Sequence, residues 1–320
     1  MKAADLELRP ATLEDAGFAA DLHTAVRPDE PEDPAQYAHF WAHPDSNRVV
    51  ERFIGEVRGE RVAFAAHRHT KWEHTTERFG NVGGELLPAW RTADRIDALV
   101  AAMEELARAD GTERFTSWAW EDDELKLGVL QARGYNEERR ERFWELDLVA
   151  KREQLARTAD DGRARMREQG IEVLTIDRVA DPEKWQKLWR VSEEAEQDVP
   201  TTVPYVETTF EDFMKWTASP GIHHDRMWIA REGERILGIS VLSYPGRGFV
   251  QTSWTAMARA ARGKGIARAL KHETVMQAIA LGVDKVRTDN DSTNAPILHL
   301  NEQMGYRRRP DMIQLMRSAV

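Results

Sequence analysis

Residues 262–267 read Arg-Gly-Lys-Gly-Ile-Ala and lie between the β-forming stretch 249–255 and helix-forming residues that start after Gly265. Two glycines allow the backbone to turn tightly and allow a ligand to approach it closely. The first N–H groups of a helix have no partner within the helix, and the helix dipole adds partial positive charge there. Because Arg262 and Lys264 add two full positive charges, the hexapeptide predicts a binding site for a pyrophosphate group.

The hexapeptide matches neither the Walker A loop nor the dinucleotide-binding loop. The first needs Gly, four residues and then Gly-Lys-Ser/Thr, and the second needs Gly-x-Gly-x-x-Gly, whereas residue 268 is Arg. A turn from strand to helix that binds no ligand therefore remains an alternative for these six residues taken alone.

The residues around the hexapeptide predict a mixture of strands and helices. Upstream, alternating residues predict a half-buried strand at 171–174, and an apolar stripe at helical spacing predicts a helix around Trp185, Leu188 and Trp189. Hydrophobic and β-branched runs predict further strands, and glycines suited to helix C-termini end two predicted helices. These strands lie at 227–230, 236–242, 249–255 and 285–289, and the helices run from Gly265 to Gly282 and from Asn294 to Met304.

The chain contains a weak internal repeat at an offset of 171 residues, which places Arg91 on Arg262. The matching positions follow the same order of helix, glycine, strand and Gly-Tyr, which favours a duplication. The matches are Ala98 with Ala269, Leu99 with Leu270, Ala109 with Ala280, Gly111 with Gly282, Leu127 with Leu298, and Gly134-Tyr135 with Gly305-Tyr306.

The charged stretch between the two copies predicts an exposed helical connector, interrupted at Thr-Ala-Asp-Asp-Gly. We therefore expect a first domain over residues 1–150, a connector over 151–168 and a second domain over 169–320. A surface helix inside a single domain is the alternative for the connector.

Arg-x-x-Gly-x-Ala after a strand, followed downstream by Asn294 and by Gly305-Tyr306, resembles the Gcn5-related N-acetyltransferase (GNAT) family. The family signature is Gln/Arg-x-x-Gly-x-Gly/Ala, which residues 262–267 fit. The resemblance extends from Ile171 to about Arg317, and the overlay makes residues 5–148 resemble a second copy.

The resemblance implies an α/β (α+β) fold of two tandem GNAT-like domains, each a mixed, mostly antiparallel sheet flanked by helices. Two central strands would splay apart to hold acetyl-CoA. The backbone near Met257 would meet the pantetheine arm and the thioester carbonyl, and the amides from Gly263 to Ala267 would hold the pyrophosphate. The implied cofactor-binding residues are Met257, Arg262, Gly263, Lys264, Gly265, Ile266, Ala267, Asn294 and Asn301.

The first copy differs at the positions that would hold the cofactor. The overlay puts Arg91-Thr92-Ala93-Asp94-Arg95-Ile96 opposite the signature, so both glycines are missing, and Asp123 stands in the place of Asn294. The carboxylate of Asp94 would crowd and repel a phosphate. We expect the first copy to bind no acetyl-CoA and to shape or stabilise the second; a first copy that binds a different ligand is the alternative.

Acetyl transfer to an amine needs a polarised thioester carbonyl, an unprotonated amine and a departing thiolate. Many family members place a tyrosine acid seven residues after the asparagine position, where this chain has Asn301, which cannot donate a proton as an acid. Tyr306 is expected in the core. Asn301 and Glu194 are the candidate catalytic residues, and the acidic residues around Glu194 could instead form a solvated face.

The composition excludes several classes of protein. The 320 residues suit about two domains of roughly 100–200 residues each. The absence of cysteine excludes disulfide scaffolds, thiolate zinc sites and cysteine nucleophiles. The histidine clusters have no evident carboxylate partner, so we expect ordinary histidines and no metal. These clusters are His67, His69 and His74, and His223 with His224.

We expect an acetyl-CoA-dependent N-acetyltransferase that moves an acetyl group directly to a small amine, with its active site in the C-terminal copy. A net charge of -10 disfavours nucleic acid and favours cationic acceptors. No stretch predicts a signal peptide or a membrane span, so we expect a cytoplasmic monomer or homodimer. A non-catalytic acyl-CoA-binding or regulatory protein and a protein amine acetyltransferase are the alternatives.

Overall fold

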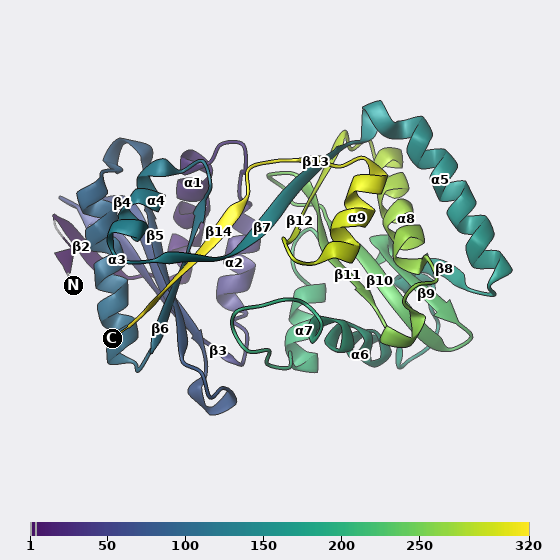
Figure 1. The fold of residues 1–320 in the computed structure, drawn as a ribbon, viewed down its shortest axis with the longest axis horizontal. Coiled ribbons are helices and arrows are strands. Elements are labelled where there is room, and N and C mark those ends of the chain that lie inside the picture. Colours follow the sequence, from purple (N-terminus) through teal and green to yellow (C-terminus); the bar gives the residue numbers. More distant parts are fainter. Residues whose placement is uncertain (1, 4, 320) are drawn as a thin grey trace. The chain divides into compact units, whose positions relative to one another are not determined.

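The computed structural model describes residues 2–3 and 5–319, which form two compact units (Figure 1). Unit 1 contains residues 1–141, 201–206 and 310–320, and unit 2 contains residues 142–200 and 207–309. Each unit thus includes segments from both halves of the sequence. None of the helices in the described part of the chain is long and apolar enough to cross a membrane.

Unit 1 is built on a sheet in the order β1-β2-β3-β4-β5-β6-β14-β7, which is antiparallel except between β5 and β6. The last strand of the chain, β14, pairs with β6 on one side and with β7 on the other. The strands are β1 (Lys2–Ala3), β2 (Leu6–Pro10), β3 (Arg48–Val57), β4 (Glu60–Thr70), β5 (Phe79–Leu86), β6 (Arg114–Trp120), β7 (Asn136–Asp147) and β14 (Met312–Ser318).

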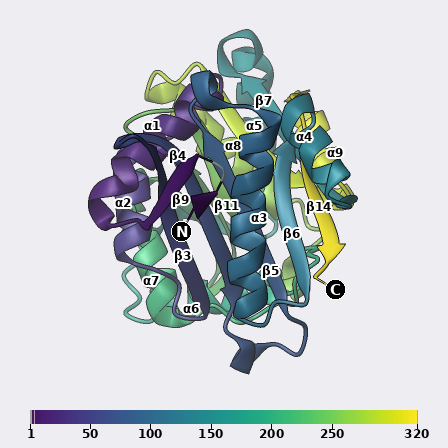
Figure 2. The ribbon, with the colours of Figure 1, turned by 90° about the vertical axis from the view of Figure 1, so that its left-hand side faces the viewer.

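Helices cover both faces of the unit 1 sheet. On one face α3 packs over β4 and β5 through Leu99 and Met103, which lie in the buried core with Ala63 and Ala65 (Figure 2). On the other face, Phe64 stacks on Trp41 of α2. The helices of unit 1 are α1 (Ala16–Val26), α2 (Pro34–Ala42), α3 (Ala93–Ala109) and α4 (Glu124–Ala132).

Unit 2 repeats this plan around a sheet in the order β7-β12-β11-β10-β9-β8, with β13 paired to β7. The central strand β10 is buried on both faces, because α6 and α7 cover one face and α8 with α5 covers the other. The strands are β8 (Glu172–Thr175), β9 (Met227–Glu232), β10 (Arg235–Ser243), β11 (Val250–Met257), β12 (Lys285–Asp291) and β13 (Arg307–Arg308). The helices are α5 (Leu148–Glu168), α6 (Lys184–Glu196), α7 (Phe210–Thr217), α8 (Ile266–Ala280) and α9 (Ala295–Met304).

Each sheet contains a strand from the opposite half of the sequence. β14 supplies unit 1 with a strand between β6 and β7. The second half of β7 belongs to unit 2, where Arg307 and Arg308 of β13 pair with it. Glu145 of β7 bonds there to the side chains of Lys285 (2.7 Å) and Arg287 (2.9 Å) of β12.

Each sheet contains one pair of parallel strands that stay paired over only a few residues. These strands are β5 and β6 in unit 1 and β11 and β12 in unit 2. β11 and β12 pair only at Val250–Val286 and Gln251–Arg287. Past this point β11 continues beside β10. Leu242 pairs with Thr252 and Val241 pairs with Trp254, so Ser253 is an extra residue without a partner on β10 and forms a β-bulge. The expected mixed, mostly antiparallel sheets with flanking helices and splayed central strands are confirmed.

The predicted interruption of the helix at residues 158–162 is wrong. α5 continues unbroken from Leu148 to Glu168. Ala159 is buried in it, and a Cβ added at Gly162 would lie 3.7 Å from Ala269 of α8. Burial of one face of α5 against α8 therefore outweighs the weak helix preference of a short Asp-Asp-Gly stretch.

Candidate functional site

The predicted glycine loop joins β11 to α8 through a short 3-10 turn at Arg259–Ala261. Gly263 (φ 78°) and Gly265 (φ 80°) adopt the left-handed conformation, which side chains disfavour. No side chain caps α8, whose first turn begins with the Ala269 N–H bonded to the carbonyl of Gly265 (3.1 Å). A Cβ added at Gly263 would meet nothing within 4 Å. The helix therefore starts with backbone N–H groups that an anion can reach.

A third cation, Arg165 of α5, lies at this loop. Its Nη1 would be 3.3 Å from a Cβ added at Gly265. The adjacent Lys264 is exposed, and its carbonyl accepts a hydrogen bond from Gln169 (3.3 Å). Sequence reasoning missed Arg165, because it lies in the connector; the basic last turn of α5, with Arg165 and Arg167, is the local signal that could have indicated it.

Arg262 does not add the free positive charge expected of it, because its Nη1 pairs with Asp198 (2.7 Å). Arg259 also binds Asp198, through two hydrogen bonds of 2.9 Å. The bonds from Arg259 and then from Arg262 lower the pKa of the Asp198 carboxyl to about 2. Asp198 is thus ionised at neutral pH and joins the loop after α6 to the loop before α8.

Glu194, one of the two candidate catalytic residues, lies beside this cluster. Its Oε1 accepts a hydrogen bond from the backbone N–H of Arg259 (3.2 Å). Its neighbour Glu193 is buried and accepts a bond from the N–H of Thr208 (3.0 Å). The carboxylates at the end of α6 therefore hold the loop that precedes α7 and the turn that follows β11, and Glu194 is partly exposed.

The other candidate catalytic residue, Asn301, is fully buried in α9. Its Nδ2 donates to Oδ1 of Asn290 on β12 (2.7 Å), whereas its own Oδ1 has no hydrogen-bond partner. Asn294 is half-buried at the start of α9, and its side chain does not cap that helix. Asn294 thus lies where β12 leads into α9, Asn301 lies near the end of α9 and contacts β12, and neither supplies an acid.

Met257 ends β11 opposite Gly238 of β10. A side chain at Gly238 would collide with the sulfur of Met257, so this glycine allows the methionine to lie across β10. The bulge at Ser253, which the sequence did not reveal, lies between Met257 and the point where β11 leaves β12. Tyr306 packs in the core against Met304 and Leu146, which confirms its predicted structural position.

The corresponding corner of unit 1 is closed by side chains. Thr92 caps α3 by accepting a hydrogen bond from the N–H of Arg95 (3.3 Å). Arg91 pairs with Asp123 (2.5 Å) and with Glu85 (3.4 Å). The hydroxyl of Thr92 therefore takes the place at the start of α3 that a phosphate would need, and Glu85, Arg91 and Asp123 line a separate cavity of about 380 Å³ in unit 1.

Comparison with known proteins identifies a family for part of the chain. Residues 185–306 match the family model described as "Acetyltransferase (GNAT) family". No curated protein matches the chain.

Solved structures share the fold along nearly the whole chain. A tandem GNAT protein from the clavulanic acid biosynthesis pathway matches with a TM-score of 0.74 at 16% identity, over 98% of this chain and 99% of that one. A GCN5-related N-acetyltransferase from Sphaerobacter thermophilus matches with a TM-score of 0.67 at 19% identity, over 100% and 97%. A GCN5-related glucosamine N-acetyltransferase region of a fungal multi-domain GH3 β-N-acetylglucosaminidase matches with a TM-score of 0.69 at 13% identity, over 99% of this chain but 38% of that one.

Proposed function

We propose, from the match of residues 185–306 to the acetyltransferase (GNAT) family model, that the chain is an acetyl-CoA-dependent N-acetyltransferase with its active site in unit 2. The acceptor that we propose is a small amine, which receives the acetyl group directly. The observation that carries the proposal is the open glycine loop at the start of α8, where no side chain caps the helix.

The loop fits the diphosphate of a coenzyme A molecule. The N–H groups of Ile266 and Ala267 precede the first hydrogen bond of α8, and Gly263 leaves free space beside them. Arg165 and Lys264 supply positive charge at the same place. Bound acetyl-CoA would supply the acetyl group as a reactive thioester.

The splayed strands give the reacting end of such a ligand a place beside β11. Between Gln251 and Met257, β11 has lost its partner β12, so backbone N–H groups on that edge can face a ligand. The bulge at Ser253 changes the direction in which these groups point. A backbone N–H placed there would polarise a thioester carbonyl as its oxygen gains negative charge.

The role that we assign to Glu194 is electrostatic, and Glu194 does not itself remove the proton from the amine. Glu194 is partly exposed, so its carboxylate would attract a cationic amine toward the end of β11, whereas the charge of Asp198 is balanced by Arg259 and Arg262. A chain of water molecules would carry the amine proton away from the site to solvent. Asn301 cannot protonate the thiolate, but a thiol pKa near about 8.5 makes that group a tolerable leaving group without an acid.

A non-catalytic acyl-CoA-binding protein is the second candidate, and the buried Asn301 favours it. Because Asn301 is held by Asn290 at the place of the expected acid, turnover would lack an assisting proton donor. Release of free thiol from acetyl-CoA with a panel of small amines and with lysine peptides separates the candidates. Turnover supports the enzyme, and the preferred acceptor separates a small-molecule from a protein substrate.

Replacing Gly265 with Asp tests the cofactor loop. The side chain would strain the left-handed backbone, approach Arg165 and place a negative charge where the diphosphate binds, so G265D should weaken acetyl-CoA binding by more than about 100-fold. Isothermal titration calorimetry measures this. The matched control is G233D in the β9–β10 turn, where the glycine also has a positive φ (59°) and open space around it.

The same titration measures the stoichiometry. Unit 1 has Thr92 and the Arg91–Asp123 pair at its helix start, so we expect one acetyl-CoA per chain. Equal affinities of G265D and G233D would refute the loop assignment. Two sites in the wild-type chain would refute the proposed closure of unit 1.

A further inference from the structure

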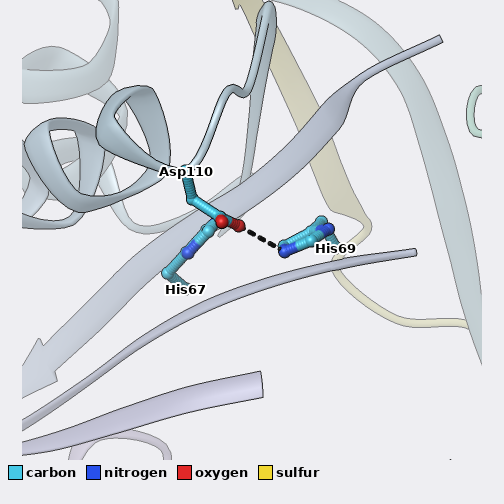
Figure 3. A group of neighbouring side chains, drawn as sticks. All are labelled: His67, His69 and Asp110. Carbon is cyan, nitrogen blue, oxygen red and sulfur yellow. Dashed lines mark ion pairs between the residues drawn. The ribbon is translucent and has the colours of Figure 1, made fainter. Parts of the chain in front are cut away.

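Three side chains of unit 1 meet where the end of β4 lies under the end of α3 (Figure 3). His67 and His69 are two residues apart on β4 and point to the same face, and Asp110 is the C-cap residue of α3. One possible ligand atom from each residue lies within 4.8 Å of the other two. Both histidines are buried, whereas the Asp110 side chain is 45% exposed.

His67 is a fully buried imidazole whose two ring nitrogens both lack a hydrogen-bond partner. The carboxylate of Glu51, across the β3–β4 ladder, is 3.7 Å from its Nδ1, too far for a hydrogen bond. An imidazole in its neutral form has one N–H donor and one lone pair, and no hydrogen bond from the described residues engages either nitrogen of His67. A buried polar group without a partner is costly and points to a missing ligand.

His69 has the arrangement of a metal-binding histidine. Its Nδ1 donates a hydrogen bond to the backbone carbonyl of Thr70 (2.7 Å), which leaves Nε2 as the nitrogen that faces the cluster. Nε2 lies 2.6 Å from Oδ2 of Asp110, an ion pair that Figure 3 marks with a dashed line. The imidazole nitrogen and the carboxylate oxygen are thus close enough for one metal ion to bind both of them.

The surroundings of the cluster also favour a cation. The C-terminal end of α3 carries the negative end of the helix dipole. Trp72 stacks on the ring of His69 at 3.8 Å and donates a hydrogen bond to the backbone carbonyl of Asp110 (2.8 Å), so it holds both ligands in place. Gly80 lies opposite His69, and a Cβ there would lie 3.2 Å from Nε2 of His67.

We propose that His67, His69 and Asp110 bind one divalent transition-metal ion of the zinc class. Two imidazole nitrogens and one carboxylate oxygen are ligands that Zn²⁺ prefers, and a water molecule can complete a tetrahedron. Ligand atoms about 2.0–2.2 Å from such an ion lie about 3.3–3.6 Å from each other. The ligand atoms of His69 and Asp110 are now 2.6 Å apart and all three lie within 4.8 Å, so the side chains must adjust as the ion enters, and the partly exposed Asp110 side chain is the one with room to move. The sequence does not reveal this partner, because Asp110 is remote from the two histidines along the chain and reaches them only through the packing of α3 on β4.

Zinc titration of the full chain after treatment with a chelator tests this site. We expect one Zn²⁺ per chain by calorimetry and by elemental analysis, and a higher melting temperature with Zn²⁺ present. H67Q and D110N should each weaken binding by more than about tenfold. D110N is the variant that preserves folding, since Asn suits a helix C-terminus and the side chain is partly exposed.

Two controls distinguish this site from other histidines. H74Q changes a partly exposed histidine in the turn that follows β4 and should bind Zn²⁺ as the wild type does. H39Q removes one ring of the His39–His43 pair on α2, whose ring centroids are 4.5 Å apart and which could chelate an ion by itself. The proposal would be overturned if the wild type bound no Zn²⁺ or if D110N bound it as tightly as the wild type. It would also be overturned if H39Q lost Zn²⁺ binding while D110N kept it.

Discussion

Lys271 illustrates what a single buried charge costs this chain. It lies on α8, is 2% exposed, and its amine has no hydrogen-bond partner. The ring of Tyr306 is 5.4 Å from the Nζ atom. Burial lowers the pKa of the Lys271 amine from 10.5 to about 8, although the charge of Asp289 acts in the opposite direction. At neutral pH the folded chain thus holds a poorly solvated ammonium group.

Lys271→Met should therefore stabilise the protein at pH 7 by about 1–3 kcal/mol. In the wild type the folded state loses the Lys271 proton near pH 8, whereas the unfolded state keeps it to about pH 10.5, so the free energy of unfolding should rise with pH across this window. K271M should lack that rise. Urea denaturation at pH 7 and pH 9.5 measures both effects.

Lys71→Met is the control for this prediction, because Lys71 is only half-buried and its replacement should change stability by less than about 0.5 kcal/mol. A destabilised K271M with an unchanged pH dependence would show that the amine is solvated or paired.

At the residue scale the site was partly predictable. The positive φ values of Gly263 and Gly265 agree with the expectation that the loop needs glycine. The neutralisation of Arg262 by Asp198 and the approach of Arg165 were not predictable, because each depends on contact between segments remote in the sequence. A charge count along the chain does not reveal which charges cancel in space.

Helix α5 shows how packing acts on a whole element. Its charged sequence indicates a solvated helix, yet Leu155, Ala159 and Met166 are buried. Arg163 forms a two-pronged ion pair with Glu273 of α8 (2.6 and 2.9 Å). The small residues Gly162 and Ala269 lie where the two helices approach each other. The helix is therefore part of the support for the start of α8.

Gly162→Ala should stabilise the chain by about 0.5–1 kcal/mol, because alanine favours helix and the added Cβ would lie at an ordinary contact distance of 3.7 Å from Ala269. Gly128→Ala in α4 is the matched control, since a Cβ there would meet nothing within 4 Å. Urea denaturation compares the two variants. A loss of stability in G162A beside a gain in G128A would mean that α5 and α8 pack more closely than this geometry allows.

At the scale of the whole molecule, the two halves of the sequence depend on each other for complete sheets. β14 is an interior strand of unit 1, and the second half of β7 is an interior strand of unit 2. A sheet that loses an interior strand exposes unpaired N–H and C=O groups along both neighbours. Each half of the sequence thus lacks one strand that its main unit requires.

Residues 1–168 and 169–320 should consequently fail to fold separately and should fold when mixed. We expect neither fragment alone to unfold cooperatively, and an equimolar mixture to recover the circular dichroism and the melting transition of the intact chain. A chain with a protease site inserted after Glu168, measured before and after cleavage, is the control for the cut itself. Cooperative unfolding of both isolated fragments would contradict the strand exchange.

Local pattern in the amino-acid sequence was sufficient to indicate the strands and helices around the glycine loop of unit 2, the repeated order of elements and the need for glycine at the start of α8. It was sufficient because hydrophobic periodicity, caps and left-handed glycines are properties of a few consecutive residues. Only the tertiary structure decided which sheet receives β14, which cations surround the loop and that Asp110 joins His67 and His69. Strand periodicity shows which face of a strand is buried but not which strand lies beside it, and side-chain clusters form between residues that the chain order keeps apart.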